Sequence, residues 1–207
     1  MLEPSKYYHI YNHANGDDIL FRNDENHYFF LRKYQHHISP VADTYAYCLM
    51  PNHFHFLVKI KSEAEIFEYL KTFPKFGTLE KFNALNDKVI SNFLSKQFAN
   101  LFSSYTQAYN KMYNRRGSLF LKNFKQKEVG DNAYFINLIR YIHANPVHHG
   151  FTKSMSDWKF SSYNSFFSEK PTLLNKMDVI NFFGSYDYFF NIHQQGDIGS
   201  LNLDFDF

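Results

Sequence analysis

The run HFHFLVKI at residues 53–60 most narrowly limits what this chain can fold into. Its even-numbered positions are all apolar: Phe54, Phe56, Val58 and Ile60. The odd-numbered positions include two histidines, His53 and His55. A period of two is that of a β-strand, whose successive side chains point to opposite faces. The run therefore predicts a half-buried strand with one apolar, core-facing side and one side that presents two imidazoles.

The rest of the chain alternates between strand and helix patterns. Further strands are expected at Tyr7–Asn12, Thr44–Cys48 and Phe124–Val129. Helices are expected from Asp24, a candidate N-cap, to about His37, over Glu63–Phe73 and over Ile90–Tyr113. Asp131 is a good N-cap for a further helix from Asn132 to about Asn145, where Pro146 disfavours helical geometry. This order predicts an α+β domain with a small antiparallel sheet and helices packed on one face.

The length of 207 residues suits one ordinary domain with a tail. We place the domain at residues 1–165 and treat residues 166–207 as an appendage, packed or partly disordered, because periodicity is weak after Trp158 and the end LNLDFDF is acidic. No apolar run approaches the ~20 residues that cross a bilayer. The start, MLEPSKYYHI, lacks the features of a signal peptide. We therefore expect no membrane partner and a cytoplasmic, nucleoid-associated protein.

Charge is unevenly distributed along the chain. The formal net charge is only +2, yet the stretch from Lys88 to Lys127 contains no acid. Its eight basic residues are Lys88, Lys96, Lys111, Arg115, Arg116, Lys122, Lys125 and Lys127. Such a stretch is typical of a surface that binds a polyanion. The alternative is a solvated helix face over which acids from elsewhere in the chain fold.

The histidine pair is a candidate metal site. Two imidazoles two residues apart on a strand project side by side, close enough to share a divalent cation. Among the chain's 11 histidines, however, such a pair also arises easily by chance. The spacing of the remaining histidines, among them His9 and His13, selects none of them, and we keep only His149 as a reserve ligand.

The expected helix after Asp131 places a second group of polar residues together. At about 100° per residue, Tyr134, Tyr141 and Asn145 lie beside its apolar stripe. Tyr141 and Asn145 are one turn apart, so their polar ends can converge on one point. Most helix tyrosines of this kind are boundary residues with a packed ring and a solvated hydroxyl.

Four segments together resemble a known family. They are YYHIYNHANGDDILF, CLMPNHFHFLV, the run RRGSLF, and RYIHANPVHHGF followed by DWKFSSY. In this order, from about Tyr7 to Tyr163, the chain resembles the single-tyrosine HUH transposases, and within them the REP-associated tyrosine transposases. That resemblance implies a ferredoxin-like or RRM-like sheet.

The resemblance also implies roles for individual residues. His53 and His55 match the metal-binding histidines, and Tyr141 matches the nucleophile. Asn145 takes the place of a third, polar ligand, which in relatives is often the longer Gln. The implied cofactor is Mg²⁺ or Mn²⁺, and two histidines plus an amide suit Mn²⁺ better.

The implied substrate is single-stranded DNA with hairpin elements, cleaved and rejoined through a 5′-phosphotyrosine link. The basic stretch would hold the DNA backbone, with Arg115, Arg116, Lys122, Lys125 and Lys127 as its DNA-binding residues. Relatives act as homodimers or as monomers, and the sequence leaves both open. Three rival interpretations remain: a catalytically silent DNA-binding protein, a metal-dependent nuclease that activates water, and a structural protein whose histidines are buried in the core.

Overall fold

Four antiparallel strands form a single sheet in the computed structural model, which describes residues 1–73 and 86–195. The strands are β1 (Tyr7–His13), β2 (Ala42–Leu49), β3 (His53–Ile60) and β4 (Lys125–Glu128). Their spatial order is β2-β3-β1-β4. One helix follows β1 and others separate β3 from β4, which is the ferredoxin-like order of elements. The expected α+β fold with an antiparallel sheet is confirmed.

The helices on the first face begin at residues with capping side chains. They are α1 (Asp24–His37), α2 (Glu63–Leu70) and α4 (Asp87–Met112). The N-cap of α1 is Asn23 rather than the expected Asp24, and the Asn23 side chain accepts a hydrogen bond from the Asn26 N–H. In α2, Ser62 and Glu65 form a reciprocal capping box.

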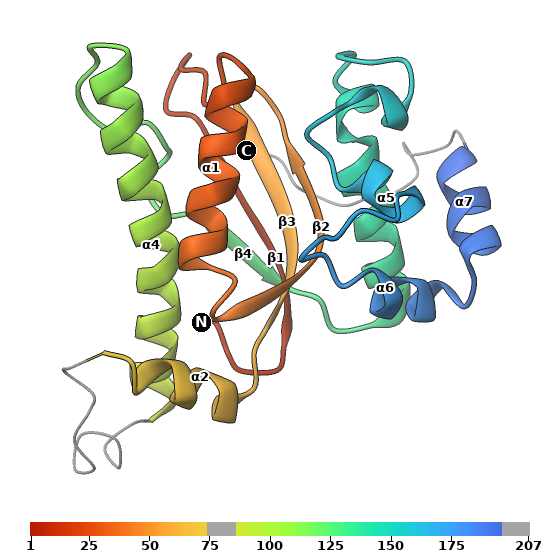
Figure 1. Cartoon of the computed structure of the whole chain (residues 1–207), viewed down its shortest axis with the longest axis horizontal. Helices are drawn as coiled ribbons and strands as arrows, with labels where there is room; N and C mark the ends of the chain where they lie inside the picture. Colours follow the sequence, from red (N-terminus) through yellow and green to blue (C-terminus); the bar gives the residue numbers. More distant parts are fainter. Residues whose placement is uncertain (74–85, 196–207) are drawn as a thin grey trace.

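The apolar side of β3 faces α1 and α4. Phe54, Phe56, Val58 and Ile60 are all buried in one cluster with residues of these helices, as the alternation predicts. Tyr8 and Ile10 of β1 join the same cluster. Figure 1 shows α1 and α4 together on one side of the sheet. This layer is the principal core of the molecule and covers the face of the sheet to which Phe54 and Phe56 point.

Helices also cover the other face, which differs from the expected one-sided arrangement. This second layer contains α5 (Asn132–His148), α6 (Lys176–Phe183) and α7 (Tyr186–Gln194), on the opposite side of the sheet in Figure 1. The physical reason lies in the strands. Leu57 and Cys48 sit on this face and are fully buried in a second apolar cluster with Ile139 and Ile142 of α5. Apolar side chains on both faces require cover on both faces.

Helix α5 continues past the point where the sequence predicted its end. It runs through Pro146 to His148. A proline in the last turn removes only its own N–H from the helical hydrogen bonds, and the next residues keep theirs. The His149 N–H donates to the Asn145 carbonyl at 3.0 Å, and the Phe151 N–H donates to the Pro146 carbonyl at 2.8 Å. The result is that Asn145 lies within the helix and not at its frayed end.

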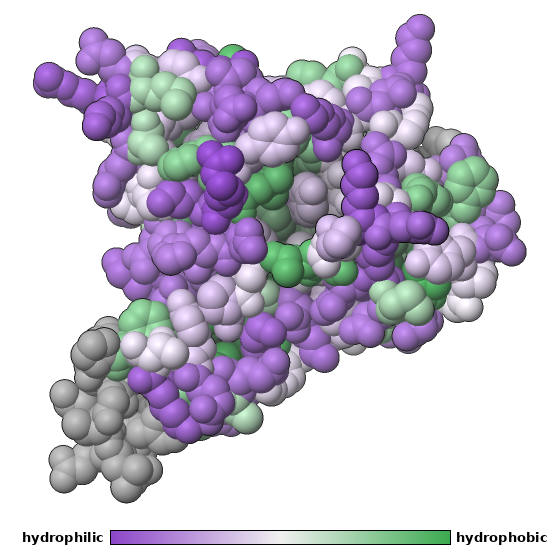
Figure 2. All heavy atoms as spheres, viewed as in Figure 1, coloured by the Kyte–Doolittle hydropathy of each residue, from purple (hydrophilic) through white to green (hydrophobic). Residues whose placement is uncertain are grey.

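Residues 166–195 pack onto the rest of the molecule. Val179, Ile180 and Phe183 of α6 and Phe189 of α7 are buried in the second apolar cluster. The expected disordered or acidic end at residues 196–207 lies outside the described residues, and the division at residue 165 stays a prediction. The view in Figure 2 shows a mostly hydrophilic surface with hydrophobic side chains gathered in the hollow between the two helical layers. No described helix has the length and hydropathy needed to cross a bilayer.

Candidate functional site

The candidate site lies on the sheet face that α5 covers. In the register of β1 and β3, His13 is opposite His53 and Tyr11 is opposite His55. Directly opposed residues of antiparallel strands project their side chains to the same face. The rings of His53 and His55 have centroids 5.2 Å apart. The sheet therefore presents the two predicted histidines together, as their spacing on β3 implied.

Helix α5 brings Asn145 and Tyr141 to these histidines. Its start is defined by Asp131, whose side chain accepts a hydrogen bond from the Tyr134 N–H at 2.8 Å. Asn145 Oδ1 lies 2.8 Å from His53 Nε2, and both residues are buried. The Tyr141 ring meets the His55 ring edge to face, with centroids 5.3 Å apart at 81°. The structure thus gathers all four predicted catalytic and metal-site residues on one face.

Each of the two histidines also contacts a second residue through its Nδ1 atom. His53 Nδ1 lies 2.9 Å from Asn52 Oδ1, and His55 Nδ1 lies 2.9 Å from His9 Nε2. Sequence reasoning missed both neighbours. Asn52 directly precedes His53 in the turn before β3, so its position was a usable signal. His9 comes from β1, and only the pairing of β1 with β3 shows that the two rings meet.

Burial keeps these imidazoles neutral. His9 and His55 are completely buried, and His53 is 3% exposed. Burial lowers the pKa of His53 to about 4 and that of His9 to about 3, and it lowers the pKa of His55 well below its usual value. A metal ion needs neutral imidazole as a ligand. These histidines are therefore in the ligand state throughout the neutral pH range.

Two of the candidate donor atoms lie at a separation that a small octahedral cation allows. Adjacent ligands of an octahedral ion with ~2.1 Å bonds are about 3 Å apart, which is close to the separation between His53 Nε2 and Asn145 Oδ1. The Asn145 Nδ2 atom is buried and forms no hydrogen bond with the described residues. Within residues 1–73 and 86–195, no three His, Cys, Asp or Glu side chains are placed to hold a metal. A metal site here would therefore consist of His53, His55 and the amide of Asn145.

The predicted basic residues divide into two groups. Lys125 lies opposite Tyr11 and Lys127 opposite His9 in the pairing of β4 with β1, so both project to the face of the candidate site. Both are exposed, as are Arg116 and Lys122. Lys127 Nζ lies 5.2 Å from the centroid of the Tyr134 ring. The edge strand β4 thus adds positive charge beside the histidines.

Arg115, one of the predicted DNA-binding residues, makes contacts within the protein. Its guanidinium forms an ion pair with Asp18, with Nε 3.0 Å from Asp18 Oδ1. It also donates to Asn110 Oδ1 at 2.9 Å and to the Ser118 carbonyl at 2.7 Å. An acid from a distant turn does fold over this part of the basic stretch. Arg115 joins loops to the end of α4, and its donors are used within the protein.

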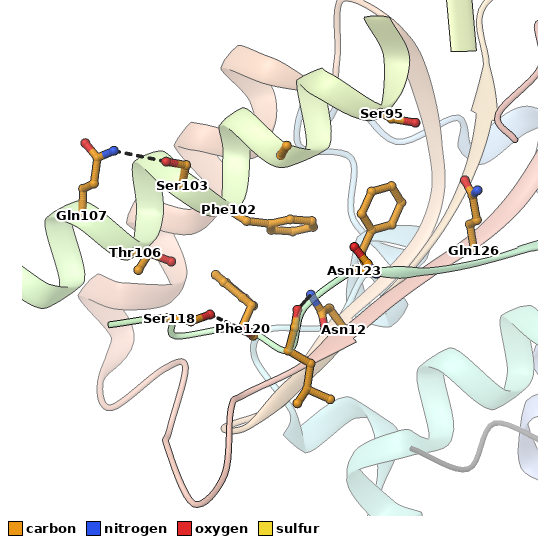
Figure 3. A pocket seen from close by; sticks show the side chains of 13 residues that line it. Asn12, Ser95, Phe102, Ser103, Thr106, Gln107, Ser118, Phe120, Asn123 and Gln126 are labelled. Carbon is orange, nitrogen blue, oxygen red and sulfur yellow. Dashed lines mark hydrogen bonds between the residues drawn. The ribbon is translucent and has the colours of Figure 1, made fainter. Parts of the chain in front are cut away.

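A separate groove lies on the opposite face. It has a volume of about 600 Å³ and runs between α4 and residues 118–126. Figure 3 shows polar and aromatic side chains around it, among them Phe102, Gln107 and Asn123. Asn12 and Gln126 line it from β1 and β4, on the side of these strands that faces α4. None of the histidines, Tyr141 or Asn145 borders this groove, so its size does not identify the candidate site.

The lowered pKa values of buried histidines lead us to expect that acid reduces the stability of the folded protein. Burial lowers the pKa of His27 and of His193, both outside the site, to about 4. In the unfolded chain these histidines take up a proton near pH 6.5, whereas in the folded protein they do so only near pH 4. The free energy of unfolding should therefore have its full value above pH 6.5 and fall between pH 6.5 and 4. We expect a loss of about 2 kcal/mol per buried histidine at pH 5, measured by urea unfolding.

His27→Phe is the matched variant for this experiment. The His27 ring is stacked on Phe160, with centroids 3.7 Å apart, and a phenyl ring can keep that packing without a titrating group. The variant should lose less stability than the wild type between pH 7 and pH 5. Equal losses in the two proteins would show that His27 does not contribute to the acid sensitivity.

Comparisons with known proteins come from sequence and from fold. No protein-family model matches the chain. A curated REP-associated tyrosine transposase of Haemophilus influenzae is 23% identical over 124 residues, which are 59% of this chain and 59% of that relative's length. A solved structure of a REP-associated tyrosine transposase bound to a REP hairpin has a TM-score of 0.57 and 14% identity, and the match covers 83% of this chain and 86% of that one. The fold is thus shared with that structure.

Proposed function

The chain resembles the REP-associated tyrosine transposases in sequence and in fold, as its motifs predicted, and on this premise we propose that it is a DNA strand transferase. Its proposed substrate is single-stranded DNA that contains a hairpin. We propose that the protein cleaves this DNA through a 5′-phosphotyrosine link and rejoins it, with the aid of Mg²⁺ or Mn²⁺.

The observation that carries the proposal is the meeting of four side chains from two distant segments. His53 and His55 come from β3, and Tyr141 and Asn145 come from α5. The Tyr141 ring lies 5.3 Å from the His55 ring between centroids, and the Asn145 amide oxygen lies 2.8 Å from His53 Nε2. Nucleophilic catalysis at a metal site needs both groups in reach of one substrate atom. The two lysines of β4 supply positive charge on the same face.

The proposed reaction balances without an energy source. The Tyr141 oxygen attacks the phosphorus, the bond between phosphorus and the 3′ oxygen breaks, and the phenol proton is lost while the departing 3′ oxygen gains one. The product is a 5′-phosphotyrosine ester and a free 3′-OH, and attack by a second 3′-OH reverses the step. The metal, when bound, polarises a non-bridging phosphate oxygen. Because an ordinary tyrosine has a pKa of about 10, that help is needed at neutral pH.

The arrangement supports catalysis within one subunit. Tyr141 lies beside His55 of its own chain, so the proposed reaction needs no residue from a second copy. A homodimer is compatible with this geometry and is not required by it.

The test of the proposal uses the unmodified protein. We expect incubation with a hairpin oligonucleotide that carries single-stranded flanks and a different label at each end, in the presence of Mn²⁺ or Mg²⁺, to give two products on a denaturing gel. The 5′ label marks a fragment with a free 3′-OH, and the 3′ label marks the covalent protein–DNA adduct. Cleavage without an adduct would indicate a nuclease that activates water. Binding without cleavage under all metal conditions would indicate a silent DNA-binding protein. Either result would overturn the proposal.

Removal of exposed charges from the basic stretch should weaken DNA binding and its dependence on salt. The variant with Arg116→Gln, Lys125→Gln and Lys127→Gln removes three exposed cations. If each contacts a backbone phosphate, the slope of log affinity against log salt should fall by about 0.7 per residue for single-stranded DNA, and affinity should fall for all sequences alike. Fluorescence anisotropy at several salt concentrations measures both.

Two control variants define this result. Lys170→Gln removes an exposed charge that precedes α6, and it should leave the salt slope unchanged. Arg115→Gln should act differently, by lowering thermal stability, because it breaks the ion pair with Asp18. An unchanged affinity and slope in the triple variant would place the DNA on another surface.

A further inference from the structure

The two candidate metal ligands are held in the same way. Each has its Nδ1 atom 2.9 Å from a neighbouring side chain, His53 from Asn52 and His55 from His9. Each has Nε2 as its remaining ring nitrogen, and Nε2 of His53 faces Asn145. Asn52 and His9 come from different segments, so local sequence does not explain why both histidines have a partner at Nδ1. A common role for the two contacts does explain it.

His9 is built into the sheet as a rigid support. It is completely buried, and its ring lies against Tyr11 at 4.5 Å and against His55 at 5.1 Å between centroids, while those two rings are 5.8 Å from each other. The two stacked pairs are nearly parallel, at 22° and 21°. A ring packed in this way cannot turn to follow a change in its neighbour. The position of His9 Nε2 therefore determines where the Nδ1 atom of His55 can lie.

The contacts also limit where the protons can be. Asn52 Oδ1 and Asn145 Oδ1 are both acceptors, and the neutral His53 ring carries one hydrogen, so it can donate to only one of them. With the hydrogen on Nδ1, the lone pair of Nε2 faces Asn145 Oδ1 at 2.8 Å. Two acceptors at this distance repel each other unless a cation lies between them. A cation site at His53 Nε2 accounts for the arrangement.

We propose that His9 and Asn52 are positioning residues that hold the proton of His55 and of His53 on Nδ1, so that Nε2 of each histidine is the metal-ligating atom. In this arrangement His55 Nδ1 donates to His9 Nε2, as His53 Nδ1 donates to Asn52 Oδ1. Partners of this kind orient metal-binding histidines and raise the basicity of the ligating nitrogen. The inference rests on the proposed metal role of the two histidines.

The first test measures the tautomers directly and needs neither metal nor activity. In the metal-free wild-type protein at pH 7.5, with ¹⁵N-labelled histidine, long-range ¹H–¹⁵N correlation spectra report which ring nitrogen carries the proton. We expect both His53 and His55 to be protonated on Nδ1, although free neutral histidine prefers the proton on Nε2. A proton on Nε2 of His55 would mean that His9 is the donor, and it would overturn the role given to His9.

The second test compares matched variants by Mn²⁺ binding, followed by electron paramagnetic resonance of free Mn²⁺. His9→Leu removes the acceptor and should weaken Mn²⁺ binding about 10- to 100-fold. His9→Gln places an amide near the position of Nε2 and should restore binding to within a few-fold of wild type. Metal-free hairpin binding should be equal in all three proteins. Wild-type affinity in His9→Leu would overturn the proposal for His9.

Asn52 provides a pair of variants outside the core. Its side chain is only half-buried, so substitution should not prevent folding. Asn52→Ala should weaken Mn²⁺ binding, whereas Asn52→Asp keeps an acceptor and should not. Equal weakening in both would count against the positioning role. If the wild-type protein bound no Mn²⁺ at all, the proposed metal function would fail, while the tautomer spectra would still decide whether His9 and Asn52 orient the two rings.

Discussion

The Tyr141→Phe variant is expected to form no covalent adduct with hairpin DNA, while its affinity for the same DNA stays close to wild type. The substitution removes one oxygen from a half-buried ring and leaves its packing against His55 in place. Loss of a covalent nucleophile costs about 10⁴-fold or more in rate, so adduct should fall below detection. A denaturing gel with labelled DNA measures the adduct, and anisotropy measures the binding.

Tyr134→Phe is the control for this prediction. Tyr134 lies two turns earlier on the same helix, and its hydroxyl is buried and forms no hydrogen bond with the described residues. Burial raises the pKa of Tyr134 to about 12, which makes its phenol harder to deprotonate. The variant should form adduct at the wild-type level. Persistent adduct in Tyr141→Phe together with loss in Tyr134→Phe would transfer the nucleophile to Tyr134.

The second large effect is expected from His55→Ala, which should lower Mn²⁺ affinity more than 100-fold and abolish cleavage. His55 is completely buried and contacts both His9 and Tyr141. Loss of a direct ligand should exceed the about 10- to 100-fold cost of losing a supporting partner. Mn²⁺ titration measures the affinity, and strand cleavage is followed on the same samples.

His149→Ala is the matched control for the metal prediction. The His149 ring lies 5.0 Å from the His53 ring between centroids, but its side chain is exposed at the end of α5. As a reserve ligand it should contribute little, and the variant should keep its Mn²⁺ affinity to within a few-fold. A loss as large as that of His55→Ala would make His149 a ligand in its own right. Full Mn²⁺ affinity in His55→Ala would refute a metal site at this histidine.

Much of the fold was predictable because periodicity reports burial directly. The alternation in residues 53–60 matched β3 at both ends, and its apolar side is the one that packs on α1 and α4. Asp131 was correctly predicted as the N-cap of α5. The misplaced end of that helix has a simple cause. Pro146 lacks the N–H that would bond to the carbonyl four residues earlier, yet the helix continues to His148, and sequence alone does not show that the last turn survives this loss.

The residues of the candidate site could be predicted from the sequence, but the residues that contact and orient them could not. His53, His55, Tyr141 and Asn145 were identified by spacing and by resemblance, and they do meet in the structure. His9 was one unselected histidine among eleven. Asp18 gave no sign that it pairs with Arg115, 97 residues away. Both contacts depend on which strands and loops become neighbours, a property that local patterns do not contain.

By itself, the sequence determined which side chains point the same way, because the geometry of a strand or a helix sets the direction of each residue relative to its neighbours. It therefore determined that His53 pairs with His55 and that Tyr141 lies one turn from Asn145. Only the tertiary structure decided that these two pairs face each other and that His9 and Asn52 hold the imidazoles. Contacts between distant segments depend on strand register and on helix packing, and these are decided by burial over the whole chain.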